Sequence, residues 1–207
     1  MQMQSLSKNF LLPLSLSMLL APSLTQSPAL AQADSFDNIK LTGKNLETET
    51  RLNKAIAKST NKGPQLSALY LERGRFYKKL AIYEKAQEDL QKAYQADPKS
   101  GIAYLERGEL LWSMEYFEKS IPDCLKAGQL LSGVERARAY RTAGRCYSKT
   151  AKFAEAIKCY SEALKTEAPH TKNITMRDRA KLYLRLQKYK EALKDGDELV
   201  AMAGGAN

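Results

Sequence analysis

A pentapeptide that occurs twice constrains the fold more than any other feature of this sequence. The run Tyr-Leu-Glu-Arg-Gly occupies 70–74 and returns 34 residues later at 104–108. A third glycine, Gly144, follows after 36 residues, and Ala180 stands another 36 residues on. Units of this length cannot bury an apolar face alone, so each must pack on its neighbours to complete a core.

The first repeat shows residue types suited to a pair of antiparallel helices. Gly74 and Ala86 are small, which allows the two helices to cross at close range. Tyr77 and Leu90 are large and can fill the space toward the next pair. Pro98 cannot continue a helix and closes the unit. This order of small, aromatic and closing residues resembles the tetratricopeptide repeat, with Tyr70 at the position that tryptophan often occupies in that family.

The resemblance implies an all-α fold, a right-handed superhelical α-solenoid of antiparallel helix pairs. About four units are expected within 66–202, at 67–100, 101–136, 137–172 and 173–202. The fourth matches less well, because Gly196 stands where a large residue is usual. A flexible C-terminus is expected at 203–207, and self-association through the last repeat stays open.

The segment before the repeats predicts export. Residues 1–31 contain one charge, Lys8, and a short apolar run interrupted by Pro13. Ala29-Leu30-Ala31 supplies a small-residue cleavage site, so we interpret 1–31 as a signal peptide. The run is shorter than the about 20 residues of a membrane span, although an uncleaved anchor remains the alternative. We expect a periplasmic or secreted protein without a stable membrane span, with a bacterial source favoured over a eukaryotic one. Residues 32–65 are expected to form a polar linker and an N-terminal capping helix at 45–59.

Positive charge concentrates on one set of predicted helices. The chain carries a formal net charge of +10. The first helices of the four units sum to +9 and the second helices to −3. In the family that the sequence resembles, the first helices line a concave groove, so the resemblance implies a basic groove that attracts acidic partners.

The family template also implies which residues face this groove. The expected partner-binding residues are Arg75, Lys78, Lys79, Leu105, Trp112, Arg138, Arg141, Arg145, Lys149, Arg177, Lys181 and Arg185. Arginine binds carboxylates through two hydrogen bonds, and an aromatic side chain is a favoured anchor at interfaces. Two alternatives stay open: the charged face is only solvated, and Trp112 packs in the core.

The sequence contains none of the motifs that carry common chemistry. Its single histidine and three cysteines form no disulfide framework and no metal-binding motif. We therefore expect no enzymatic activity, no cofactor and no metal. Cys124, Cys146 and Cys159 are expected to pack as apolar residues, and a bridge between Cys124 and Cys146 stays open.

These features together predict an exported protein–protein interaction scaffold or assembly helper. Its ligand would be an acidic or carboxylate-bearing peptide segment held in the basic groove. Two alternatives remain. One is an anionic polymer in the same groove, wall polysaccharide or the less favoured nucleic acid, and the other is a role as accessory subunit of an enzyme complex.

Overall fold

The computed structural model describes residues 40–59 and 63–204. The expected signal peptide at 1–31 lies outside these residues, as do 205–207. The chain divides into two units, Met1–Asp37 and Asn38–Asn207, and the description below concerns the second. No helix in the described part is long and apolar enough to cross a membrane.

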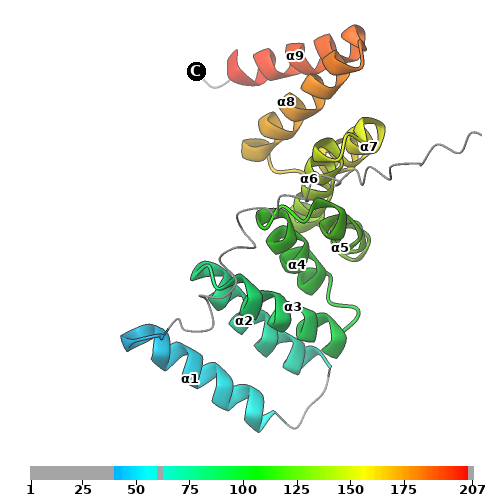
Figure 1. The fold of residues 1–207 in the computed structure, drawn as a ribbon. Coiled ribbons are helices and arrows are strands. Elements are labelled where there is room, and N and C mark those ends of the chain that lie inside the picture. The colour runs from blue at the N-terminus through cyan, green and yellow to red at the C-terminus, as the bar shows by residue number, and fades with distance from the viewer. Residues whose placement is uncertain (1–39, 60–62, 205–207) are drawn as a thin grey trace, which may run out of the picture. The chain divides into compact units, whose positions relative to one another are not determined.

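The described residues fold entirely into helices and the turns between them (Figure 1). The helices are α1 (Gly43–Lys58), α2 (Pro64–Lys79), α3 (Tyr83–Ala96), α4 (Gly101–Ser113), α5 (Phe117–Leu130), α6 (Gly133–Lys149), α7 (Phe153–Leu164), α8 (Pro169–Arg185) and α9 (Tyr189–Gly204). The last helix thus continues two residues into the segment that was expected to be flexible from 203 onward.

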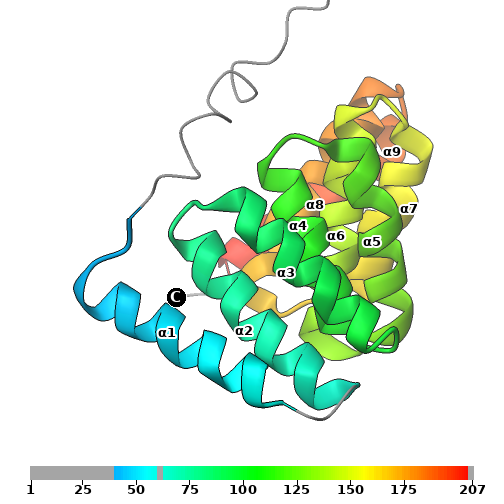
Figure 2. The same cartoon turned by 60° about the horizontal axis from the view of Figure 1, so that its bottom comes forward.

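Helices α2 to α9 form four consecutive antiparallel pairs, and each pair packs on the next (Figure 2). The second helix of a pair contacts the first helix of the following pair, so every unit completes its neighbour's core. This arrangement confirms the predicted all-α solenoid. Helix α1 packs on α2, where Leu52 is buried and the Tyr77 hydroxyl donates to Glu49 Oε1 at 2.6 Å.

The paired helices lie in close contact where the sequence places its repeated glycines. A Cβ at Gly144 would stand 2.7 Å from the ring of Tyr160, and one at Gly108 would stand 2.5 Å from Cys124 Sγ. A Cβ at Gly74 would stand 3.0 Å from Leu90. The prediction that small residues mark the helix crossings is confirmed.

The turn inside each pair has a feature that the sequence did not reveal. Ala81, Glu115, Ala151 and Gln187 all adopt a positive φ, between 58° and 62°. They hold equivalent positions in the four units. The following amide N–H reaches back five residues in each turn, as from Lys152 to the Tyr147 carbonyl at 2.9 Å. The chain therefore reverses through a left-handed residue without using the glycine that usually occupies such a position.

Three of the four units also contain an ion pair between their two helices. Arg107 Nε donates to Asp123 Oδ2 at 2.6 Å, and Asp123 is 3% exposed. The equivalent pairs are Arg73–Asp89 and Arg179–Asp195. The third unit has Ala143 and Cys159 at these positions, and both are buried in one apolar cluster.

The cysteines are buried and free. Cys124 Sγ lies 3.5 Å from Ser120 Oγ, and the Cys146 thiol donates to the same hydroxyl at 3.3 Å. Burial raises the pKa of Cys159 to about 12, so this thiol is neutral at physiological pH. The bridge between Cys124 and Cys146 that the sequence left open is not formed in this structure.

Candidate functional site

The first helices of the first three pairs lie closer to one another than the second helices do. Helix α4 contacts both α2 and α6, whereas α3, α5 and α7 make no comparable contact with one another. Because the inner side of a curved stack is the more crowded one, α2, α4, α6 and α8 form its inner face. This face carries most of the residues that were expected to bind a partner.

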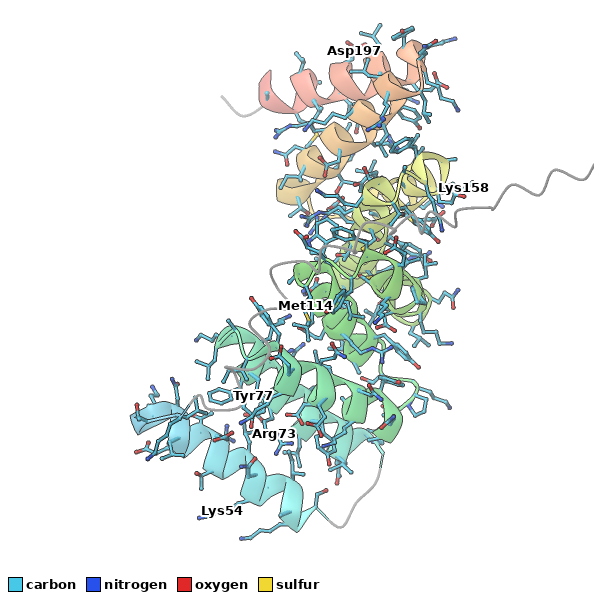
Figure 3. The ribbon with its side chains drawn as sticks, viewed as in Figure 1. Lys54, Arg73, Tyr77, Met114, Lys158 and Asp197 are labelled. Atoms are coloured by element: carbon cyan, nitrogen blue, oxygen red, sulfur yellow. The ribbon has the colours of Figure 1, made fainter. Side chains whose placement is uncertain are left out.

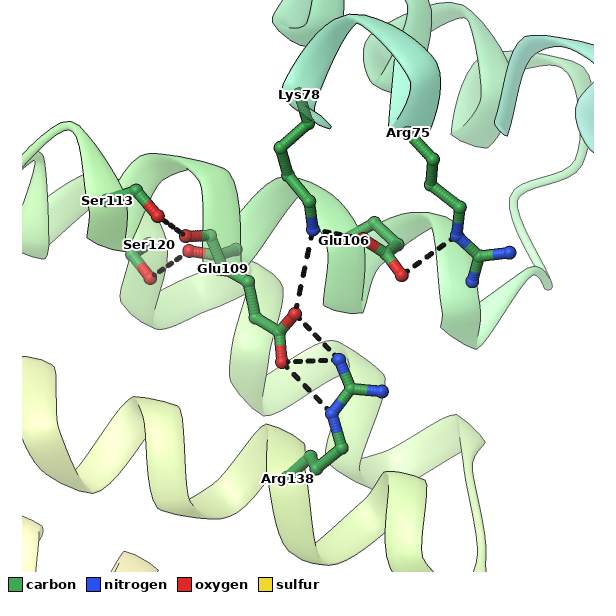
Figure 4. Close-up of polar contacts among 8 residues, drawn as sticks. Arg75, Lys78, Glu106, Glu109, Ser113, Ser120 and Arg138 are labelled. Carbon is green, nitrogen blue, oxygen red and sulfur yellow. Dashed lines mark hydrogen bonds and ion pairs between the residues drawn. The ribbon is translucent and has the colours of Figure 1, made fainter. Parts of the chain in front are cut away.

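Two glutamates of α4 neutralise part of the positive charge on this face (Figure 4). Glu106 binds the Lys78 ammonium and accepts a 2.9 Å hydrogen bond from Arg75 Nε. Glu109 accepts hydrogen bonds from Arg138 Nη2, 2.8 Å from each carboxylate oxygen. The three cations come from α2 and α6, so these contacts join three successive first helices.

The protonation of Glu106 reflects two opposing effects. Burial alone would raise the pKa of this carboxyl, but the hydrogen bond and charge of Lys78, together with Arg75, hold the pKa below its ordinary value. Glu106 therefore remains ionised at neutral pH. It is paired within the chain, so the cations around it are only partly available to a ligand.

Leu105 is not part of the accessible inner face, which corrects the sequence prediction. It is fully buried in a cluster with Ala127 and Ala139, and Leu131 packs against that cluster. The family template treats this position as ligand-facing, but here the next pair covers it. Arg141 is the equivalent residue one unit later, and its guanidinium binds Glu167, the counterpart of Leu131. An apolar contact in the second unit thus becomes an ion pair in the third.

The remaining expected cations have no ion-pair partner within residues 40–59 and 63–204. They are Lys79, Arg145, Lys149, Arg177, Lys181 and Arg185, all of them exposed. Arg145 and Arg185 instead lie over aromatic rings, 4.2 Å from the centroid of Trp112 and 4.4 Å from that of Phe153. Five of the six belong to the third and fourth units, so the unpaired charge is concentrated in the C-terminal half of the inner face.

Trp112 lies at the boundary between the two halves. It is partly exposed, and its ring centroid is 5.0 Å from that of Phe117. It lines one hollow of about 370 Å³ toward the first unit, together with Lys78, Glu109 and Arg141. It also lines a second hollow of about 300 Å³ toward α8, which we call the C-terminal hollow.

The C-terminal hollow combines apolar and basic walls. Trp112, Tyr160 and Leu182 supply the apolar surface. Arg145, Lys149 and Lys181 supply cations, and Asp178 is the only carboxylate that lines it. Helices α6 and α8 are less closely packed than α4 and α6, which leaves room at this seam. The arrangement can accept a large apolar side chain with a carboxylate beside it.

Sequence reasoning missed Glu106, which binds two of the expected cations. Glu106 belongs to the repeated pentapeptide, and α4 is the only first helix with a negative sum of charges. That contrast with the basic helices before and after it was the available signal. Within the described part of the chain, no group of three or more His, Cys, Asp or Glu side chains could hold a metal ion.

A family model described as "Tetratricopeptide repeat" matches residues 67–100 and 137–170. These two segments are tetratricopeptide repeats (TPRs). The matched segments correspond to α2–α3 and to α6–α7 with the start of α8. The expectation drawn from the repeated pentapeptide is thereby confirmed.

Known proteins resemble this chain in sequence or in fold. A segment of 76 residues is 34% identical to the mouse (Mus musculus) mitochondrial import receptor subunit TOM70, and covers 35% of this chain but only 12% of that protein. MamA from Desulfovibrio magneticus RS-1 is 14% identical with a TM-score of 0.66, over 88% of this chain and 98% of MamA. YrrB, described as a TPR protein with an unusual peptide-binding site, is 18% identical with a TM-score of 0.59, over 76% of this chain and 80% of YrrB. At such identities the structural likeness concerns the fold alone.

Proposed function

We propose that this protein is an exported interaction scaffold that binds an acidic or carboxylate-bearing peptide segment on its inner face. The observation that carries the proposal is the C-terminal hollow, which three unpaired cations line together with the partly exposed ring of Trp112. An apolar side chain of the ligand would enter the hollow and contact Trp112. Acidic groups beside it would pair with Arg145, Lys149 and Lys181.

The uneven distribution of charge indicates which part of the inner face the acidic residues of the ligand would contact. Glu106 and Glu109 already occupy Arg75, Lys78 and Arg138, so an acidic ligand gains little from the first two units. In the third unit Arg138 and Arg141 are paired, but Arg145 and Lys149 are not, and the fourth unit adds Arg177, Lys181 and Arg185, which have no ion-pair partner among the described residues. The acidic part of the ligand is therefore placed over α6 and α8.

Relatives support the class of function. YrrB is described by its peptide-binding site, and TOM70 by its role as an import receptor. Both descriptions fit a TPR surface that recognises another polypeptide. Export is proposed from the features of residues 1–31. If the signal peptide is cleaved, the measured mass of the mature protein should correspond to a chain that begins near Gln32.

The binding proposal is tested with a synthetic peptide of four aspartates followed by a C-terminal phenylalanine. Trp112 is the only tryptophan of the chain, so its fluorescence reports occupancy of the hollow directly. We expect the double variant Arg145→Glu/Lys181→Glu to bind at least about 10-fold more weakly, because two charge-assisted contacts become repulsive. Arg141 is unsuitable for this test, since its reversal would disrupt the pair with Glu167.

The matched control reverses two lysines on the second helices. Lys126→Glu/Lys158→Glu changes the net charge by the same amount, at exposed residues of α5 and α7. Lys158 is labelled in Figure 3. It should leave the affinity for the peptide unchanged. Equal losses in both double variants would mean that net charge alone governs binding. Equal affinity for a peptide with lysines in place of the aspartates would refute an acidic ligand.

A further inference from the structure

The last described helix presents an apolar stripe to solvent. Tyr189 and Leu193 are each 65% exposed and Val200 is 73% exposed. With Gly196 they occupy positions i, i+4, i+7 and i+11 of α9, which lie on one side of a helix. A Cβ at Gly196 would meet no atom within 4 Å, so the middle of the stripe is an open depression.

The third unit shows what normally covers this stripe. The residues 36 positions earlier are Phe153, Ile157, Tyr160 and Leu164. Phe153 and Ile157 pack on a cluster that contains Tyr160 and Leu182, a residue of α8. The stripe of α7 is thus covered by the next helix, whereas no described element covers the stripe of α9. The surface has the form of a helix-binding face.

We propose that the α9 stripe pairs with the same stripe of a second copy of this chain, with the two helices antiparallel. In that register Leu193 of each copy enters the depression at Gly196 of the other. Tyr189 of each copy packs on Val200 of the other. A twofold axis requires one surface to complement itself, and a large residue beside a glycine meets that requirement.

The charges beside the stripe fit the same register. Lys190 and Asp197 are seven residues apart and exposed, on the flank of the stripe that faces away from the rest of the fourth unit. Asp197 is labelled on α9 in Figure 3. In an antiparallel helix pair, these flanking positions face each other across the interface. Lys190 of each copy would therefore lie opposite Asp197 of the other, and the twofold axis would produce two such ion pairs.

A head-to-tail contact with α1 explains the surface less well. The outer side of α1 exposes one large apolar residue, Leu46, which is 48% exposed. Glu47, Arg51 and Lys54 surround it. That surface cannot match a stripe of three large apolar side chains, so the self-complementary contact is favoured.

The first test is the mass of the purified chain as a function of concentration, by analytical ultracentrifugation. We expect the mass to rise from monomer toward dimer as the concentration reaches the hundreds of micromolar, because two short helices bury a small interface. Leu193→Glu/Val200→Glu should stay monomeric at every concentration, while Leu46→Glu on α1 should dimerise like the wild type. A wild-type chain that stays monomeric throughout would overturn the proposal.

The second test identifies the occupant of the stripe. Lys190→Glu and Asp197→Lys should each weaken dimerisation by about 10-fold, because each places like charges opposite one another. The double variant restores opposite charges and should regain the wild-type dissociation constant. Failure of the double variant to regain it would exclude this register. Helix content and thermal unfolding measured in parallel show that each variant is folded.

The interface is separate from the inner face. The variant Leu193→Glu/Val200→Glu should therefore keep its affinity for the acidic peptide measured through Trp112. Loss of the dimer with retained peptide binding separates the two proposals experimentally.

Discussion

A left-handed residue at the turn inside every unit shows how the fold overrides local preference. Ala81, Glu115, Ala151 and Gln187 adopt a conformation that costs a side chain about 1 kcal/mol or more. The two helices flanking each turn are fixed by packing along their length. The turn must therefore accept whichever conformation joins them.

Replacing one of these residues with glycine should stabilise the protein. We expect Ala151→Gly to raise the free energy of unfolding by about 0.5–1 kcal/mol, because glycine adopts this conformation freely. Ala68 is an exposed residue inside α2 and provides the control. Ala68→Gly should lower the free energy by about 1 kcal/mol, as glycine does in a helix interior. Urea unfolding measures both, and a loss of stability in Ala151→Gly would contradict the expected relief of strain.

At the scale of helices, an Arg–Asp ion pair joins the two helices of three units, and an apolar contact takes its place in the remaining unit. Arg107–Asp123 and its two equivalents join the helices of the first, second and fourth units. Ala143 and Cys159 perform that role in the third unit with apolar contact. The same position between two paired helices therefore holds a buried ion pair in three units and an apolar contact in the other.

The difference between the second and third units suggests a double-mutant cycle at Arg107 and Asp123. Asp123→Cys alone should lower the free energy of unfolding by about 3 kcal/mol, because it leaves the Arg107 guanidinium without its partner in a largely buried place. Arg107→Ala/Asp123→Cys reproduces the third unit and should cost clearly less than Asp123→Cys. Chemical denaturation of the single and double variants gives the coupling energy. Additive losses would show that the pair is not energetically coupled.

At the scale of the whole molecule, the net charge overestimates the positive charge that is available to a ligand on the inner face. Five of the twelve expected inner-face residues are paired or buried: Arg75, Lys78, Leu105, Arg138 and Arg141. The free cations cluster beside Trp112 and over α8. The inner face thus has a nearly neutral first half and a basic second half.

This distribution predicts how binding depends on salt. An acidic peptide held partly by the C-terminal hollow should lose about 10-fold in affinity between about 50 and 200 mM salt, because few ion pairs form. A single-stranded DNA 20-mer that depends on many cations should lose on the order of 1,000-fold. Fluorescence titration at several salt concentrations measures both. A DNA affinity that exceeds the peptide affinity at the higher salt would favour the anionic polymer instead.

The sequence alone determined the features that depend on periodicity. The 34-residue spacing, the glycines at the helix crossings and the excess charge of the first helices could all be predicted, because they follow from helical geometry and from the type of each residue. These features need no knowledge of which side chains meet.

Tertiary structure decided which residues remain available to a ligand. Leu105 and Arg141 occupy the same position of the repeat, yet one is buried against an apolar neighbour and the other is paired with Glu167. Their partners lie 26 residues further along the chain and are brought close only when successive pairs stack. Whether a charged side chain faces a ligand or a neighbour depends on that stacking, and a repeat pattern read along one unit does not contain it.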